Sequence, residues 1–187
     1  MRGDGRQKIS QEYWRRGVVK LDYVPNGIDE INHYYGNPDS DKDLEVDEYF
    51  FEKVIKWYQL TYPLRSAWNP EVIVTKLRLH SGIATSVLDA IEWAMEMVGP
   101  LEMRKNDWDR TAGTYCFREM RGYPALSTHS WAIAIDMNSH IALWGGKAKD
   151  QPQIWIDAFK NRGWIYGGDW APRWTGDPMH FQACRGY

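Results

Sequence analysis

The chain has 187 residues, of which 43% are apolar and 26% charged, and its formal net charge is −2. Such a chain can bury one core of ordinary size, and a charge this close to neutral, without a dense basic stretch, argues against binding of nucleic acid. No apolar run reaches the roughly 18 residues of a membrane helix, and MRGDGRQKIS lacks the apolar segment of a secretory signal. We therefore expect a protein made in the cytosol, with no signal peptide and no membrane partner.

Residues 1–70 are expected to form a helical N-terminal extension that precedes the core or packs on it. Tyr13 and Trp14 permit a short helix near the start. Apolar residues at three- and four-residue steps predict two further helices, over 28–35 and over 44–60.

Three aspartates, Asp39, Asp41 and Asp43, stand just before the second of these predicted helices. Acidic residues are favourable at a helix N-terminus. Their alternate spacing is similar to that of a calcium-binding loop, but the central glycine and the terminal glutamate of such a loop are missing. We therefore expect a solvated helix start here and no cation site.

Residues 71–187 are expected to form the core, which is richer in strands. The predicted elements are, in chain order, a strand over 71–79, a helix over 83–98, strands over 113–119 and 131–138, a helix over 153–161 and a short final strand over 179–184. Between the last two lies a loop rich in glycine and tryptophan. The pattern indicates an α+β fold in which helices flank a small antiparallel sheet.

The two cysteines are too few and too far apart for a disulfide framework. We expect Cys116 and Cys184 to be buried thiols, and a bridge between adjacent strands is the alternative. The 11 tryptophans are far more than usual, so some are expected to be exposed in a groove.

A zinc ion in a catalytic site takes three protein ligands, and His129, Asp136 and His180 offer such a set. Alternation along 131–138 places Asp136 on a face otherwise occupied by alanines. His129 lies an odd number of positions from Asp136, so the chain must bend near Ser130 or Trp131 to bring both to one site. A hydrogen-bonded polar network of the same residues is the alternative interpretation.

Asp177 precedes His180 by three positions, and the odd spacing places it beside the proposed metal and not among its ligands. There a carboxylate can take a proton from an attacking water and later give it to the leaving amine.

Two ordered motifs resemble the zinc peptidases of the D-alanyl-D-alanine carboxypeptidase and L-alanyl-D-glutamate endopeptidase family, and the phage endolysin branch in particular. The first motif comprises Ser127, His129, Ala132, Ala134 and Asp136, and the second Asp177, His180 and Phe181. The similarity runs from about Thr75 onward and includes YCFREMRG and GWIYGGDW. It departs from the family at Ala132, where relatives commonly have glycine, a difference that matters if the backbone there has positive φ.

The resemblance implies a hedgehog- or carboxypeptidase-like fold with a zinc site in a cleft on the sheet. It also implies one Zn²⁺ on His129, Asp136 and His180, with Asp177 as the general base. By position, Arg118 would contact a substrate carboxylate or the oxyanion.

Three further residues are weaker candidates for substrate binding. Arg121 is the reserve for Arg118, although a solvated loop arginine would look the same. Ser127 either supports a zinc ligand through a hydrogen bond or only caps a turn. Trp174, with Trp170, either forms a wall of the cleft or belongs to the core.

We therefore expect a zinc metallopeptidase that hydrolyses an amide bond in the stem peptides of peptidoglycan, most simply L-Ala–D-Glu. A D-Ala-D-Ala carboxypeptidase and a non-catalytic zinc-bearing module for cell-wall binding or a phage tail are the alternatives. An enzyme of bacteriophage origin would reach the wall through holin-assisted release or as part of the virion.

Overall fold

The computed structural model describes residues 17–186, so the predicted helix around Tyr13 and Trp14 lies outside the described residues. The elements are α2 (Ile28–Tyr35), α3 (Glu48–Val54), β1 (Ile55–Ser66), β2 (Ile73–His80), α4 (Ala84–Val98), α5 (Pro100–Lys105), β3 (Arg110–Gly113), the 3-10 turn η1 (Thr128–Trp131), β4 (Ala134–Met137), η2 (Ala148–Asp150), α6 (Gln153–Lys160), β5 (Ile165–Tyr166), η3 (Gly167–Trp170) and β6 (His180–Gln182). None of the described helices is long and apolar enough to cross a lipid bilayer.

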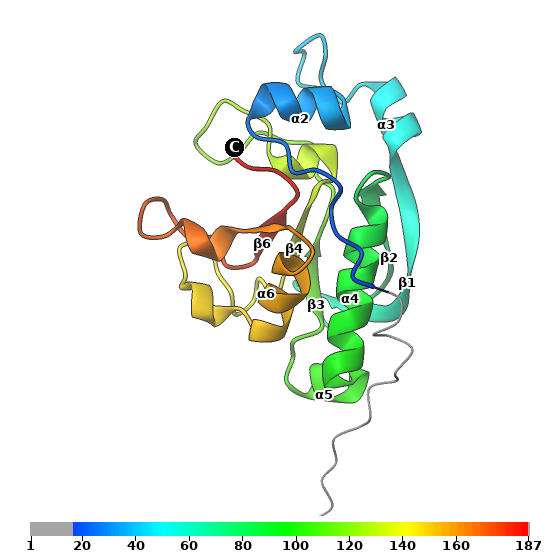
Figure 1. Cartoon of the computed structure of the whole chain (residues 1–187), viewed down its shortest axis with the longest axis vertical. Coiled ribbons are helices and arrows are strands. Elements are labelled where there is room, and N and C mark those ends of the chain that lie inside the picture. Colours follow the sequence, from blue (N-terminus) through cyan, green and yellow to red (C-terminus); the bar gives the residue numbers. More distant parts are fainter. Residues whose placement is uncertain (1–16, 187) are drawn as a thin grey trace, which may run out of the picture.

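The strands form one six-stranded sheet with the order β2-β1-β3-β4-β6-β5. Helix α4 packs against α6 and against β1 (Figure 1). The α+β class is confirmed. The sheet is mixed, however, and not purely antiparallel as predicted, because β1 and β3 pair in parallel.

The helices predicted over 28–35, 83–98 and 153–161 are confirmed as α2, α4 and α6. Each has a clear apolar face: on α4, for instance, Val87, Ile91 and Ala94 are fully buried in the core. A positive φ at Gly99 ends α4, and Pro100 then begins the short helix α5, which is not among the predicted elements.

The helix predicted over 44–60 is wrong beyond Val54. Helix α3 has only seven residues, and 55–66 form the long strand β1, which pairs antiparallel with β2. The apolar steps of this segment fit a helix, but its aromatic and β-branched residues favour a strand once a partner is available. Pro63 falls between Gln59 and Leu64, where the register of the pairing shifts, so it interrupts no regular ladder.

The strand predicted over 113–119 is also wrong, since β3 ends at Gly113. The residues that follow bond to the turn η1 instead of to a strand. The Cys116 N–H donates to the His129 carbonyl at 3.2 Å, and the Arg118 N–H donates to Ser130 Oγ at 3.1 Å. Both cysteines are free thiols, but Cys116 is exposed, so its predicted burial is wrong as well, whereas Cys184 is buried.

The early segments pack directly on the late ones. The Tyr35 hydroxyl donates to the Ala183 carbonyl at 3.0 Å, and the Trp131 indole donates to the Gly36 carbonyl at 2.8 Å. Helix α2 therefore lies against the end of the sheet that carries η1 and the last strand (Figure 1).

Candidate metal centre

Two neighbouring strands and one tight turn bring three metal-ligating side chains together. Asp136 in β4 and His180 in β6 are directly opposite in the antiparallel ladder, so their side chains share one face of the sheet. His129 comes from η1, which is the bend that the sequence predicts between the first two residues.

The three ligand atoms form a small triangle. His129 Nε2 lies 3.3 Å from His180 Nδ1 and 3.3 Å from Asp136 Oδ1, and His180 Nδ1 lies 2.8 Å from Asp136 Oδ1. Ligands at about 2.0–2.1 Å from a tetrahedral zinc ion are about 3.3 Å apart. The donor set and its spacing therefore fit a zinc ion with a fourth position left over.

Hydrogen bonds fix which nitrogen of each histidine is free to bind the metal. His129 Nδ1 lies 3.1 Å from the Thr114 carbonyl, to which only a protonated nitrogen can donate. The lone pair of His129 is therefore on Nε2, inside the triangle.

His180 has the opposite arrangement. Its Nε2 lies 3.0 Å from Gln182 Oε1 and 3.3 Å from Thr128 Oγ1, while its Nδ1 faces Asp136. The Gln182 amide is oriented in turn, because its Nε2 donates to the Cys184 carbonyl at 3.1 Å. With Nε2 donating to Gln182, Nδ1 is the nitrogen that shares a proton with Asp136, and it can bind a metal once it is deprotonated.

Asp136 and His180 each shift the pKa of the other toward the charged form. Burial raises the pKa of Asp136, but the imidazoles of His129 and His180 lower it by more, and the net pKa lies well below the usual range. Burial lowers the pKa of His180, but the hydrogen bond and charge of Asp136 outweigh that effect and raise it. A buried anion against two imidazoles is the charge distribution that suits a divalent cation.

Asp177 lies beside this triangle. Burial is the main cause of its raised pKa, and its Oδ1 is buried without a hydrogen bond to any residue that the structure describes. Its main chain packs closely on Gly167, whose carbonyl accepts the Asp177 N–H at 3.0 Å. A half-buried carboxylate whose buried oxygen has no hydrogen bond within residues 17–186 is suited to taking up and returning a proton.

The turn that carries His129 is held from both ends. Ser127 Oγ accepts the His129 N–H at 3.4 Å, so Ser127 caps η1 and does not reach a zinc ligand's ring. Ala132 follows the turn with φ 54° and ψ 33°, the left-handed conformation. Ala132 therefore adopts a backbone conformation that alanine disfavours.

The metal centre opens into a cavity of about 710 Å³. Its lining includes Asp177, Arg118, Arg121 and Ser127 in addition to the three ligands. Arg118 is exposed and donates to the Glu119 carbonyl at 2.9 Å, and it does not stand on a strand. Both arginines thus lie on the wall of the cavity, while the structure gives neither a contact with the ligand triangle.

Of the two tryptophans that the sequence favours, Trp170 lines this cavity and Trp174 does not. Trp174 is 69% exposed and is absent from the lining. Trp68, Trp144 and Trp170 line the cavity, and the Trp170 ring centroid lies 5.7 Å from that of His180. Trp170 and two tryptophans from distant segments thus give the cavity aromatic surfaces, and their contact with a substrate stays a prediction.

Sequence reasoning missed the supports of both histidines. Thr114 acts through its carbonyl, which no side-chain pattern reveals. Thr128 and Gln182 flank ligands in sequence, and the shared face of His180 and Gln182 on one strand was a usable signal.

Comparisons with known proteins agree with this geometry. Residues 121–183 match a family model described as D-alanyl-D-alanine carboxypeptidase. Neither the search of curated proteins nor that of solved structures found a match. The matched segment contains the three metal ligands and Asp177 but begins after Arg118. The match supports a hydrolase of the peptidase class.

Proposed function

We propose that this protein is a zinc-dependent peptidase that hydrolyses an amide bond in the stem peptides of peptidoglycan, namely the L-Ala–D-Glu bond. The observation that supports this most strongly is the combination of the His129, Asp136 and His180 triangle with the free, buried carboxylate of Asp177 in one open cavity. A site that served only to hold the fold would need no such carboxylate beside it.

His129, Asp136 and His180 would hold the zinc ion, which when bound supplies a Lewis acid for water and for the scissile carbonyl. Asp177 accepts the proton of the attacking water and then donates it to the departing amine. Burial raises the pKa of Asp177, which favours uptake of that proton. The hydrogen bonds to Thr114 and Gln182 keep the two imidazoles in the correct tautomers throughout.

Substrate would lie along the cavity wall. Arg118 and Arg121 provide positive charge for the carboxylates of a stem peptide, and Arg118 also faces the Asp177 charge. Trp170 and Trp144 offer flat apolar surfaces on the same cavity. Stem peptides combine acidic groups with small apolar side chains, which suits a wall of this composition.

A D-Ala-D-Ala carboxypeptidase is the second candidate, because the matched family model carries that description. An arginine on the cavity wall would then bind the terminal carboxylate of the peptide. In either case the same four residues perform the hydrolysis, and only the position of the bond differs. The proposed biological role is that of a phage endolysin, released with the help of a holin or carried on the virion.

The products separate these possibilities. Purified cell walls are incubated with zinc-loaded protein, and the released material is analysed by mass spectrometry. An L-Ala–D-Glu endopeptidase exposes new amino groups on D-Glu, a carboxypeptidase releases free D-Ala, and a non-catalytic module releases neither. A chelator should abolish release, and added Zn²⁺ should restore it.

Asp177→Asn tests the proposed base, with Asp169→Asn as the matched control. Asp169 is an exposed carboxylate in η3 whose ion pair with Lys160 lies at the surface. We expect Asp177→Asn to keep its zinc and lose activity by about 10²–10⁴-fold, and Asp169→Asn to stay active. Equal activity of wild type and Asp177→Asn would refute the mechanism, and zinc-loaded wild type that releases neither product would refute the function.

A further inference from the structure

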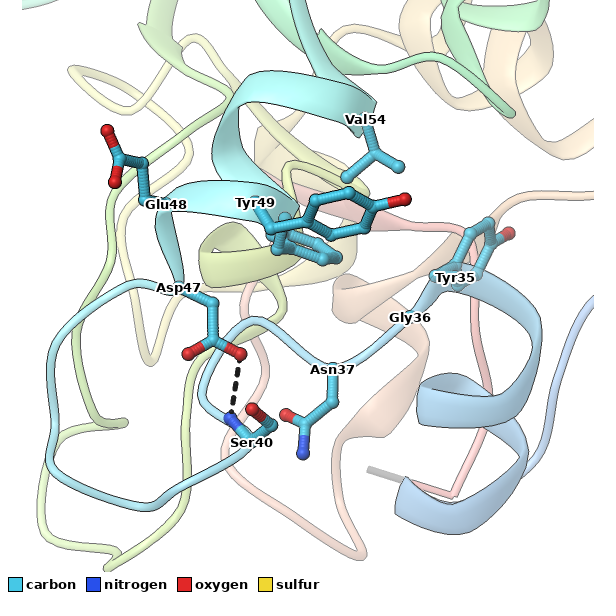
Figure 2. A pocket seen from close by; sticks show the side chains of 9 residues that line it. Tyr35, Gly36, Asn37, Ser40, Asp47, Glu48, Tyr49 and Val54 are labelled. Carbon is cyan, nitrogen blue, oxygen red and sulfur yellow. Dashed lines mark hydrogen bonds between the residues drawn. The ribbon is translucent and has the colours of Figure 1, made fainter.

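A second group of carboxylates lies in the loop of residues 38–47, between α2 and α3. Helix α3 begins only at Glu48, so Asp39, Asp41 and Asp43 are not the start of a helix, and that expectation is wrong. The loop is closed at its base, where the Ser40 N–H donates to Asp47 Oδ2 at 3.1 Å (Figure 2). The three aspartates therefore need another explanation.

Asp39 is the decisive residue of this loop. Only 7% of it is exposed, and its Oδ1 is buried without a hydrogen bond to any residue within 17–186. The structure gives no ion pair for it among those residues. Burial of a charged carboxylate without a partner is unfavourable, and a bound cation is one way to compensate its charge.

The side chain of Asp39 points toward two further carboxylates. One oxygen each of Asp39, Asp41 and Asp43 lies within 4.8 Å of the other two. Two oxygens bound to the same Ca²⁺ at about 2.4 Å can be at most about 4.8 Å apart. The three oxygens are thus close enough to share one calcium ion.

Charge in the loop strengthens the case. Residues 39–48 read DSDKDLEVDE, with six acidic side chains against the single Lys42. The main chain places Asp41 and Asp43 by local bonds, since their Oδ1 atoms accept the N–H groups of Asp43 and Glu45. Like charges held this close repel one another, and a divalent cation would turn that repulsion into attraction.

The missing central glycine is no obstacle in this loop. Leu44 takes the place of that glycine and already has a φ of 66°. The backbone therefore has the left-handed turn that the glycine of a calcium loop usually provides.

We propose that Asp39, Asp41 and Asp43 bind one Ca²⁺ ion at a site separate from the zinc centre. The carboxylate oxygens are hard ligands, which favour Ca²⁺ over zinc or other softer metals. Three carboxylates on one irregular loop do not provide the near-ideal octahedron that Mg²⁺ demands, which favours Ca²⁺ over Mg²⁺. The ion would hold the loop between α2 and α3 in its closed form.

The site is also connected to the wall of the catalytic cavity. Gly36 ends α2 just before the loop, and its carbonyl accepts the indole N–H of Trp131 in η1. The same turn carries His129. An ion in the loop would therefore stabilise the segment against which the turn packs.

Titration of zinc-loaded full-length protein with CaCl₂, followed by calorimetry and thermal unfolding, tests the proposal. We expect one ion per chain, with a dissociation constant between about 10 µM and 1 mM. At ten times that concentration the unfolding midpoint should rise by about 4 °C. MgCl₂ should produce a markedly smaller rise.

Asp39→Asn and Asp41→Asn should each weaken calcium binding at least about tenfold, and exposed Asp22→Asn, with the same change of charge, should not. Asp41 is exposed, so its variant decides the question if Asp39→Asn does not fold. Absence of calcium binding at millimolar concentration, unchanged binding in Asp41→Asn, or an equal response to Mg²⁺ would each overturn the proposal. Since zinc content and peptide release are measured separately, failure here leaves the proposed peptidase intact.

Discussion

Gly167 packs against the main chain of Asp177, the proposed base. Gly167→Ala therefore tests how closely Asp177 must be positioned for activity. A Cβ on Gly167 would lie 2.5 Å from the Asp177 carbonyl oxygen and 3.2 Å from its Cβ. The obstacle is main chain and not a flexible side chain, so the alanine cannot be accommodated by a change of rotamer.

The size of the effect follows from these distances. Ordinary contacts of a Cβ begin at about 3.4 Å, so the 2.5 Å contact must open by nearly 1 Å. A displacement of about 1 Å in a reacting group costs about 10²-fold in rate. We expect Gly167→Ala to lower kcat by about 10- to 100-fold and the free energy of unfolding by about 1–3 kcal/mol, with zinc content unchanged.

The assay compares peptide release, zinc content and thermal unfolding for wild type, Gly167→Ala and Gly163→Ala. Gly163 ends the turn after α6 with φ 88° and has no atom closer than 4.0 Å to an added Cβ. Alanine there should cost about 1–2 kcal/mol of backbone strain and leave kcat unchanged. Full activity in Gly167→Ala would show that this contact does not position Asp177, and loss of zinc would show that the effect falls on the ligands instead.

Three further predictions concern stability. His80 is buried, with Nδ1 accepting the Gly82 N–H at 3.0 Å, and burial is the main cause of its lowered pKa. Because the pKa of His80 is lower in the folded state, neutral His80 contributes its full share of the free energy of unfolding above about pH 6.5, and that share declines at lower pH by at most about 1.4 kcal/mol per pH unit. In urea unfolding, wild type should lose more stability between pH 8 and pH 5 than His80→Gln does. An equal loss would show that His80 does not have the lowered pKa. Asp109 is 1% exposed, and the Arg65 Nε–H is shared between its two carboxylate oxygens at 3.0 Å each, while Arg65 Nη2 also donates to it. Asp109→Asn should therefore cost about 3 kcal/mol in denaturant unfolding, and a cost below about 1 kcal/mol would mean that the pair contributes little. Ala132→Gly should change the free energy of unfolding by less than about 1 kcal/mol. Glycine relieves the strain of the left-handed backbone, but it buries one methyl group less and has more conformational freedom in the unfolded chain. Stabilisation beyond about 2 kcal/mol in the same assay would show that the backbone strain dominates.

The ligand geometry was largely predictable from the sequence. The period of two along a strand assigns a face to Asp136, and the odd spacing to His129 requires the bend that η1 provides. These are local rules, and residues close in sequence determine them.

The predictions from sequence fail where residues distant in the chain determine the local structure. Residues 55–66 fit a helix by spacing, and only pairing with β2 makes them a strand. Residues 114–119 alternate like a strand, but they bond to η1, which the pattern cannot reveal. The burial of Asp39 is of the same kind, because it depends on how the loop packs and not on the spacing of the aspartates.

The position of β6 in the sheet has a consequence for synthesis of the protein. This strand follows β4 and β5 in the chain but lies between them in the sheet. Until residue 182 has left the ribosome, β5 has no neighbour and one edge of β4 is open to other chains. The same late segment contains His180 and Asp177, so the nascent chain has neither the third ligand nor the proposed base. The candidate metal centre is therefore completed only when the last strand enters the sheet between β4 and β5.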